Sequence, residues 1–210
     1  MLPAASSLIS GMSEADRNIP PGWNYNPAAW SQRLPIVLLA LIGFCIALYL
    51  AAYQYCQQFN WCLVTDPWEP FFGRGTETIL NSRLSWVAWP FSDALLGALG
   101  YLADAVAGLL GGPSRWRTLP WTVILFAILV GPLGAISIAL VIAQPVFEGA
   151  WCTLCLTTAV ISVMMIGPAM DEALASLQYM KRLVDSGRAS WWQAFWGGDT
   201  PPVPPRHVPQ

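Results

Sequence analysis

The sequence contains few charged residues and a single histidine. Charged side chains make up 10% of its 210 residues, whereas about a quarter of the residues of an ordinary soluble domain are charged. Hydrophobic residues reach 55%, which indicates a chain that lies largely in lipid rather than a soluble single domain. Because His207 stands alone in a proline-rich tail, a metal site built from several histidines is excluded.

Long runs of basic residues are absent as well. No more than two basic residues are adjacent and the formal net charge is −2, so the chain lacks the electrostatic footprint of a nucleic-acid-binding protein. The segment up to Ser31 also lacks the charged start, apolar core and small-residue cleavage site of a secretory signal peptide. We therefore expect the first membrane span to direct the chain to the membrane.

Four apolar segments are candidates for membrane-spanning helices, because each approaches the roughly 20 residues that a helix needs to cross a bilayer. They are residues 34–55, 92–112, 119–144 and 151–168. The second is the least hydrophobic, since it carries Asp93 at its mouth and Asp104 inside. The sequence therefore predicts an all-α integral membrane protein, a bundle of four transmembrane helices.

The predicted bundle divides the chain into four parts. Residues 1–33 form a polar N-terminal segment, and residues 34–168 form the four-span domain. Residues 169–198 contain apolar side chains at helical spacing, which predict an amphipathic cytoplasmic helix in the membrane interface. These side chains are Leu174, Leu177, Met180 and Leu183. Residues 199–210 form a proline-rich tail.

The positions of lysine and arginine indicate the orientation, because these residues concentrate in cytoplasmic loops near the spans. With the N-terminus inside, eight basic residues lie inside and only Arg74 and Arg83 lie outside. We therefore expect both termini to be cytoplasmic, in a bacterial cell membrane, and residues 56–91 to be extracytoplasmic. The aromatic residues of this segment indicate either a lid in the membrane interface or an aromatic belt. They are Trp61, Trp68, Phe71, Phe72, Trp86 and Trp89.

A redox-type motif, Cys152-Thr153-Leu154-Cys155, stands at the extracytoplasmic mouth of the fourth predicted span. The first turn of a helix brings the two sulfur atoms within bridging distance, and the N–H groups and partial positive charge of a helix N-terminus stabilise a thiolate. This pattern favours redox chemistry. The alternatives are a structural disulfide or half of a zinc site, although no second cysteine pair or suitably spaced histidine faces the motif.

Three stretches of the sequence resemble the vitamin K epoxide reductase family. Residues 151–158, Trp-Cys-Thr-Leu-Cys-Leu-Thr-Thr, are similar to its active-site helix. Residues 77–83, Glu-Thr-Ile-Leu-Asn-Ser-Arg, and residues 96–101, Leu-Gly-Ala-Leu-Gly-Tyr, resemble its loop serine segment and the Gly/Tyr signature of its second span. The resemblance covers about residues 34–167 and implies a four-helix bundle that encloses a quinone.

The resemblance also implies a role for each cysteine of the motif. Cys155, nearer the membrane interior, is expected to face the quinone, and Cys152 to exchange disulfides with a thiol donor, so that two electrons pass from a protein dithiol to ubiquinone or menaquinone. Ser82, Asp93 and Tyr101 are candidate quinone-binding residues by the same resemblance. Ordinary helix capping or a turn explains Ser82 and Asp93 equally well.

Three further residues support predictions about the spans and the quinone pocket. Asp104, inside the second predicted span, is either a functional acid or an acid that reaches the cytoplasmic mouth. Cys45 is expected to be a small buried hydrophobic residue in the first span. Ala159 stands where the family sometimes has an aromatic residue, which implies a wider or differently gated quinone pocket.

The sequence departs from the family pattern in the loop that normally carries an electron-shuttling cysteine pair. Thr76 stands where the family has a cysteine before the acidic residue that Glu77 matches. Cys56 and Cys62 are candidates for a relocated shuttle pair, for a structural disulfide, or for two thiols without a bond. No thioredoxin-like domain follows the fourth span, so a separate extracytoplasmic thioredoxin-like partner is expected.

Three functions compete on these observations. The preferred one is a membrane oxidoreductase that passes electrons from an extracytoplasmic dithiol to a quinone. The second is a non-catalytic membrane subunit with a structural disulfide, which docks a neighbouring membrane complex. The third is a quinone-binding protein without turnover, or a small transporter in which Asp93 and Asp104 form a polar pathway, although the spans show no internal repeat.

Overall fold

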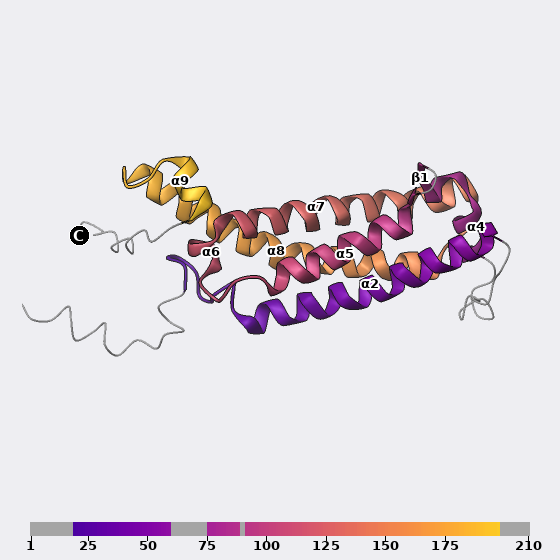
Figure 1. The fold of residues 1–210 in the computed structure, drawn as a ribbon, viewed down its shortest axis with the longest axis horizontal. Coiled ribbons are helices and arrows are strands. Elements are labelled where there is room, and N and C mark those ends of the chain that lie inside the picture. The colour runs from indigo at the N-terminus through magenta and orange to yellow at the C-terminus, as the bar shows by residue number, and fades with distance from the viewer. Residues whose placement is uncertain (1–18, 60–74, 89–90, 198–210) are drawn as a thin grey trace, which may run out of the picture.

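The computed structural model describes residues 19–59, 75–88 and 91–197 of the chain. Four helices lie side by side along its long axis (Figure 1). They are α2 (Trp30–Phe59), α5 (Asp93–Leu109), α7 (Pro120–Ala143) and α8 (Thr153–Asp185). Helix α2 packs on α5 and α8, and α7 packs on α8 and α5, so the four helices close into a bundle.

Three of the described helical stretches are long and apolar enough to cross a membrane. They are Trp30–Phe59, Pro120–Glu148 and Thr153–Asp185. Helix α5 is not among them, because its 17 residues extend about 26 Å, slightly less than the roughly 30 Å of a bilayer core. The prediction of a mostly helical membrane protein is confirmed, whereas the number of four spans stays a prediction.

The interior of the bundle is built from small residues that let the helices approach closely. Ala40 and Ala47 of α2 and Ala98 and Ala105 of α5 are all buried in one cluster. At Gly43, an added Cβ atom would lie 2.6 Å from the ring of Tyr101. Many of the larger aliphatic side chains are exposed around the bundle, as expected for helices that face lipid. Examples are Leu38, Ile42, Ile128, Ile136 and Val160.

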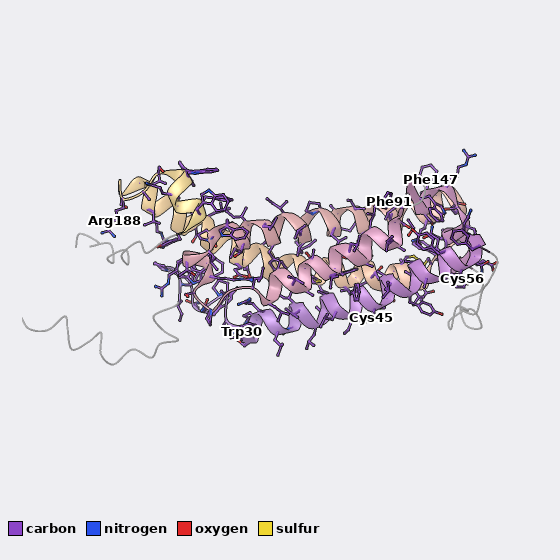
Figure 2. The ribbon with its side chains drawn as sticks, viewed as in Figure 1. Trp30, Cys45, Cys56, Phe91, Phe147 and Arg188 are labelled. Atoms are coloured by element: carbon purple, nitrogen blue, oxygen red, sulfur yellow. A yellow bond between two sulfur atoms is a disulfide. The ribbon has the colours of Figure 1, made fainter. Side chains whose placement is uncertain are left out.

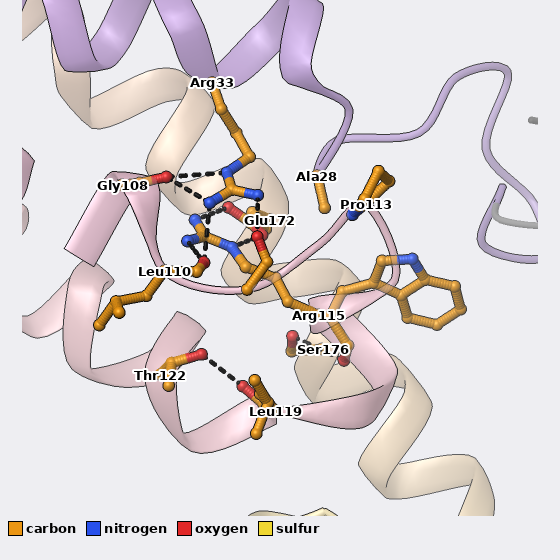
Figure 3. A network of polar contacts seen from close by, with 12 residues as sticks. Ala28, Arg33, Gly108, Leu110, Pro113, Arg115, Leu119, Thr122, Glu172 and Ser176 are labelled. Carbon is orange, nitrogen blue, oxygen red and sulfur yellow. Dashed lines mark hydrogen bonds and ion pairs between the residues drawn. The ribbon is translucent and has the colours of Figure 1, made fainter. Parts of the chain in front are cut away.

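Two buried arginines close one end of the bundle (Figure 3). Arg33 donates hydrogen bonds to the carbonyl oxygens of Gly108, Leu110 and Gly111. Arg115 donates to the carbonyl oxygens of Ala107 and Leu110, and its guanidinium forms a two-pronged ion pair with Glu172 of α8. These carbonyls belong to the last turn of α5 and the loop after it, where a helix has no backbone donors of its own.

Short elements form the opposite end (Figure 1). They are α4 (Gly75–Asn81), the 3₁₀ helix η2 (Arg83–Ser85), the antiparallel strands β1 (Trp86–Ala88) and β2 (Phe91–Ser92), and the π-helix η3 (Gln144–Glu148). Gln54 of α2 ties this end together, because its amide donates to the carbonyl oxygens of Leu80 and Ser85. The predicted lid remains a prediction, since Trp61, Trp68, Phe71, Phe72 and Trp89 lie outside the described residues.

The helix of the fourth predicted span is longer than the span itself, and the place where it leaves the membrane stays a prediction. The predicted boundary at residues 168/169 falls inside α8, which continues through Pro168 to Asp185. A membrane helix tolerates an internal proline, because neighbouring groups can satisfy the backbone that it frees. The helix ends at Asp185, and Gly187 just beyond it has a positive φ of 67°. The short helices α6 (Arg115–Thr118) and α9 (Trp191–Trp196) lie near this end (Figure 1).

The prediction for Cys45 is wrong. This cysteine is a free thiol on the exposed side of α2 (Figure 2). The helix presents Ala40, Gly43 and Ala47 to its neighbours, so position 45 faces outward, toward the lipid of the predicted membrane.

Candidate functional site

The cysteine motif lies at the start of α8, as the sequence predicts. Cys152 is the N-cap residue of the helix, and the backbone N–H of Cys155 is directed at the Cys152 sulfur at 3.1 Å. The two residues form a disulfide bond, with their Cα atoms 5.2 Å apart. The sulfur atoms therefore lie where free N–H groups and the helix dipole stabilise negative charge after reduction.

The two cysteines differ in their surroundings. Cys152 is 0% exposed and packs among apolar side chains of α2, α4 and α8, namely Leu50, Tyr53, Ile79, Leu80 and Leu154. Cys155 is half-buried and lines a cavity. The family resemblance implies that Cys152 reacts with a thiol donor. In this conformation, however, Cys152 is the cysteine that other side chains cover.

Helix α4 is the element that covers Cys152. Ile79 and Leu80 are buried against the motif, and the first residue of the helix, Gly75, lies directly on the carbonyl oxygen of Trp151. A Cβ atom added to Gly75 would lie 2.0 Å from that oxygen, so this contact requires a glycine. In this conformation Cys152 is therefore not accessible from solvent.

A cavity of about 540 Å³ lies beside Cys155, mainly between α5 and α7. Its size is that of a typical small-molecule site, and most of its lining is aliphatic. Apolar contacts come from Leu96, Ile128, Leu133, Ile136 and Leu140, among others. Polar contacts come from Ser85, Asp93, Tyr101, Ser137, Gln144 and Thr158.

The structure brings some of the predicted quinone-binding residues together and leaves one apart. Asp93 and Tyr101 line the cavity with Cys155. The hydroxyl of Tyr101 donates to the carbonyl oxygen of Thr158 at 2.6 Å, which fixes the ring against α8. Ser82 does not line the cavity, and its buried hydroxyl has no hydrogen-bond partner among the described residues.

The second pair of cysteines is described only in part. Cys56 is buried near the end of α2, at the same end of the bundle as Phe91 and Phe147, and it is disulfide-bonded (Figure 2). Cys62 lies outside the described residues. The prediction that these two cysteines form a shuttle pair therefore stays a prediction.

Two further polar residues lie in the helices: Asp104, a candidate functional acid by sequence, and Gln144, to which the sequence assigned no role. Asp104 of α5 is 1% exposed, and neither carboxylate oxygen has a partner in the described part of the chain. It does not line the cavity. Gln144 does line the cavity, and its amide oxygen accepts a hydrogen bond from the backbone N–H of Cys152 at 3.0 Å. The sequence signal for Gln144 was a polar residue at the end of an apolar run, directly before the turn into the motif.

The described residues contain no cluster of side chains that could bind a metal ion. Within residues 19–59, 75–88 and 91–197, no three histidine, cysteine, aspartate or glutamate side chains are grouped so that they could hold a metal ion.

Comparison with known protein families gives one match. A model of the vitamin K epoxide reductase family matches residues 34–169, which include the Cys152–Cys155 pair and every residue that lines the cavity. Comparisons with curated proteins and with solved structures found no match.

Proposed function

Because the chain belongs to the vitamin K epoxide reductase family, whose members are membrane oxidoreductases, we propose that it transfers electrons from an extracytoplasmic dithiol to a membrane quinone. The observation that carries the proposal is the position of Cys155. One sulfur of a disulfide at a helix N-terminus lines a largely aliphatic cavity between membrane helices. Such a cavity suits a lipid-soluble electron acceptor.

The cavity can be reached from the lipid. Leu96 of α5 and Ile128 and Ile136 of α7 line the cavity and are also exposed on the outside of the bundle. A quinone can therefore place its ring near Cys155 and its aliphatic tail between α5 and α7 without crossing water. Either ubiquinone or menaquinone fits this description.

The proposed reaction conserves atoms and electrons. A donor thiolate attacks the Cys152 sulfur, and a second donor thiol resolves the mixed disulfide, so that Cys152 and Cys155 become thiols and the donor becomes a disulfide. The motif then re-forms its disulfide while two electrons and two protons pass to the quinone, which becomes a quinol. In sum, donor dithiol and quinone give donor disulfide and quinol.

We propose a separate thioredoxin-like protein as the donor, on the extracytoplasmic side of a bacterial cell membrane. The excess of basic residues at the α6 and α9 end of the bundle supports this orientation. Of the five cysteines, Cys62 is the remaining candidate to pair with the disulfide-bonded Cys56, since Cys45 is free and Cys152 is bonded to Cys155. A Cys56–Cys62 pair would relay electrons to Cys152.

A second candidate function rests on the burial of Cys152. A disulfide in which Cys152 is fully covered, packed against α4 and α2, suits a non-catalytic membrane subunit in which the Cys152–Cys155 bond only stabilises the fold. In the first function the Cys152–Cys155 bond opens and re-forms in each cycle, whereas in the second it stays closed.

The test is quinone reduction by the chain in proteoliposomes, with a reduced thioredoxin-like protein as donor and a short-tail ubiquinone as acceptor. We expect Cys152→Ala and Cys155→Ala to lower the rate to background, because either change removes the disulfide. Cys45→Ala is the matched control, since Cys45 is a free thiol on the outside of α2, and it should leave the rate unchanged. A motif that stays oxidised with every donor would establish the structural alternative.

A further inference from the structure

The amide of Gln144 has a fixed orientation. Its Oε1 atom accepts the hydrogen bond of the Cys152 N–H, and a backbone N–H can only donate. The opposite orientation would place two donors against each other, so the Nε2 group must point away from Cys152. Gln144 is 4% exposed and lines the cavity, and Nε2 has no hydrogen-bond partner among the described residues.

The hydroxyl groups that line the cavity already donate hydrogen bonds to other atoms of the protein. Each donates to a backbone carbonyl oxygen: Ser85 to Ile79, Tyr101 to Thr158, Ser137 to Leu133, and Thr158 to Cys155. The backbone N–H of Cys155 is directed at the Cys152 sulfur. The carboxylate of Asp93 accepts the N–H of Ala94 and, while ionised, offers no hydrogen. Among the described cavity residues, Gln144 thus holds the uncommitted side-chain donor.

A quinone ring presents two carbonyl oxygens, which only accept hydrogen bonds. Burying such an oxygen without a donor costs free energy, and so does burying an amide N–H without an acceptor. In this cavity the quinone carbonyl lacks a donor and the Gln144 amide lacks an acceptor, so each group can satisfy the other. We propose that Gln144 Nε2 donates a hydrogen bond to one quinone carbonyl and so holds the ring beside Cys155.

This inference rests on the proposed function and deepens it. Through its two amide atoms, Gln144 would hold the backbone of Cys152 on one side and the electron acceptor on the other. It transfers no proton in the reaction, because the two protons of the quinol come from the donor dithiol. Its contribution is quinone affinity and the position of the ring.

The test uses the full chain in nanodiscs, with the short-tail ubiquinone as probe. Gln144→Met keeps the approximate size of the side chain but removes both amide atoms. We expect the quinone KM to rise about tenfold, the effect of losing one buried hydrogen bond, and the donor KM to stay within about twofold. Gln178→Met is the matched control, because Gln178 is an exposed glutamine of α8 that does not line the cavity, and we expect an unchanged quinone KM.

Gln144→Glu separates the two roles of the residue. A carboxylate keeps an oxygen for the Cys152 N–H but has no hydrogen for a quinone, whereas a carboxylic acid has one. Its quinone KM should therefore rise with increasing pH relative to the wild type. A quinone KM within twofold of the wild type in Gln144→Met, or a donor KM that rises by the same factor as the quinone KM, overturns the inference.

Direct binding keeps the inference separate from the proposed function. Quenching of tryptophan fluorescence by the ubiquinone measures affinity for the oxidised chain, in which no turnover occurs. If the wild type binds quinone but never cycles, the proposed oxidoreductase fails while a weaker affinity of Gln144→Met still supports the role of Gln144. If the wild type cycles and the variant binds equally well, the role of Gln144 fails alone.

Discussion

Cys152 and Cys155 are three residues apart, but only Cys155 reaches the cavity. The difference follows from the helix: Cys152 is the cap residue and turns toward α4, whereas Cys155 lies in the first turn of α8. An asymmetric pair of this kind gives each sulfur one reaction partner. In the proposed reaction, the donor and the quinone therefore never compete for the same atom.

Asp104 offers a prediction at the same scale. Its carboxylate is buried without a partner among the described residues and lies away from the cavity. Because a carboxyl group buried without a partner must either keep its charge in an apolar site or take up a proton on folding, Asp104→Asn should raise the free energy of unfolding at neutral pH by about 1 kcal/mol and leave quinone reduction unchanged. Thermal unfolding in detergent checks this.

The matched control is Asp171→Asn, at an acid that accepts a hydrogen bond from Tyr25 at 2.7 Å. That change removes a charged acceptor and should not stabilise the protein. Loss of quinone reduction in Asp104→Asn would contradict the account, because it would give the carboxylate a part in the reaction.

At the scale of elements, α4 controls access to the motif, and Gly75 sets how closely it sits. Gly75→Ala places a methyl group 2.0 Å from the Trp151 carbonyl oxygen, so α4 must shift away. In a Cys155→Ala background, alkylation of Cys152 by a soluble maleimide should then become about tenfold faster, since overpacking costs roughly 1–3 kcal/mol.

Gly167→Ala in α8 is the control for this experiment, because a Cβ atom there meets nothing within 4 Å. It should leave the alkylation rate unchanged. Equal rates in the Gly75→Ala variant and its parent would show that α4 does not limit access to Cys152.

The other end of the bundle depends on the ion pair between α6 and α8. Glu172→Ala leaves the guanidinium of Arg115 buried without its carboxylate, which should lower the free energy of unfolding by about 3–5 kcal/mol. Tyr25→Phe removes an exposed hydrogen bond and should have a much smaller effect. Unfolding of both variants in one detergent checks the difference, and similar losses would contradict the importance of this network.

For the whole molecule, the sequence predicted the helical membrane fold, the family and the position of the motif, because long apolar runs and a Cys-x-x-Cys pair are local signals. It missed features that depend on contacts between distant segments. Cys152 is buried by residues 79 and 80, Gln144 meets Cys152 through the turn after α7, and α8 continues through Pro168. The outward position of Cys45 depends on which face of α2 the other helices cover.

The central claim is that the Cys152–Cys155 bond exchanges electrons with a membrane quinone. The most direct measurement reduces the motif in proteoliposomes, removes the reductant, adds the short-tail ubiquinone, and follows both the alkylation state of each cysteine and the amount of quinol. The account predicts that the Cys152–Cys155 disulfide re-forms and that one quinol appears for each disulfide formed. A motif that stays reduced, or that re-oxidises equally fast without quinone, would contradict it.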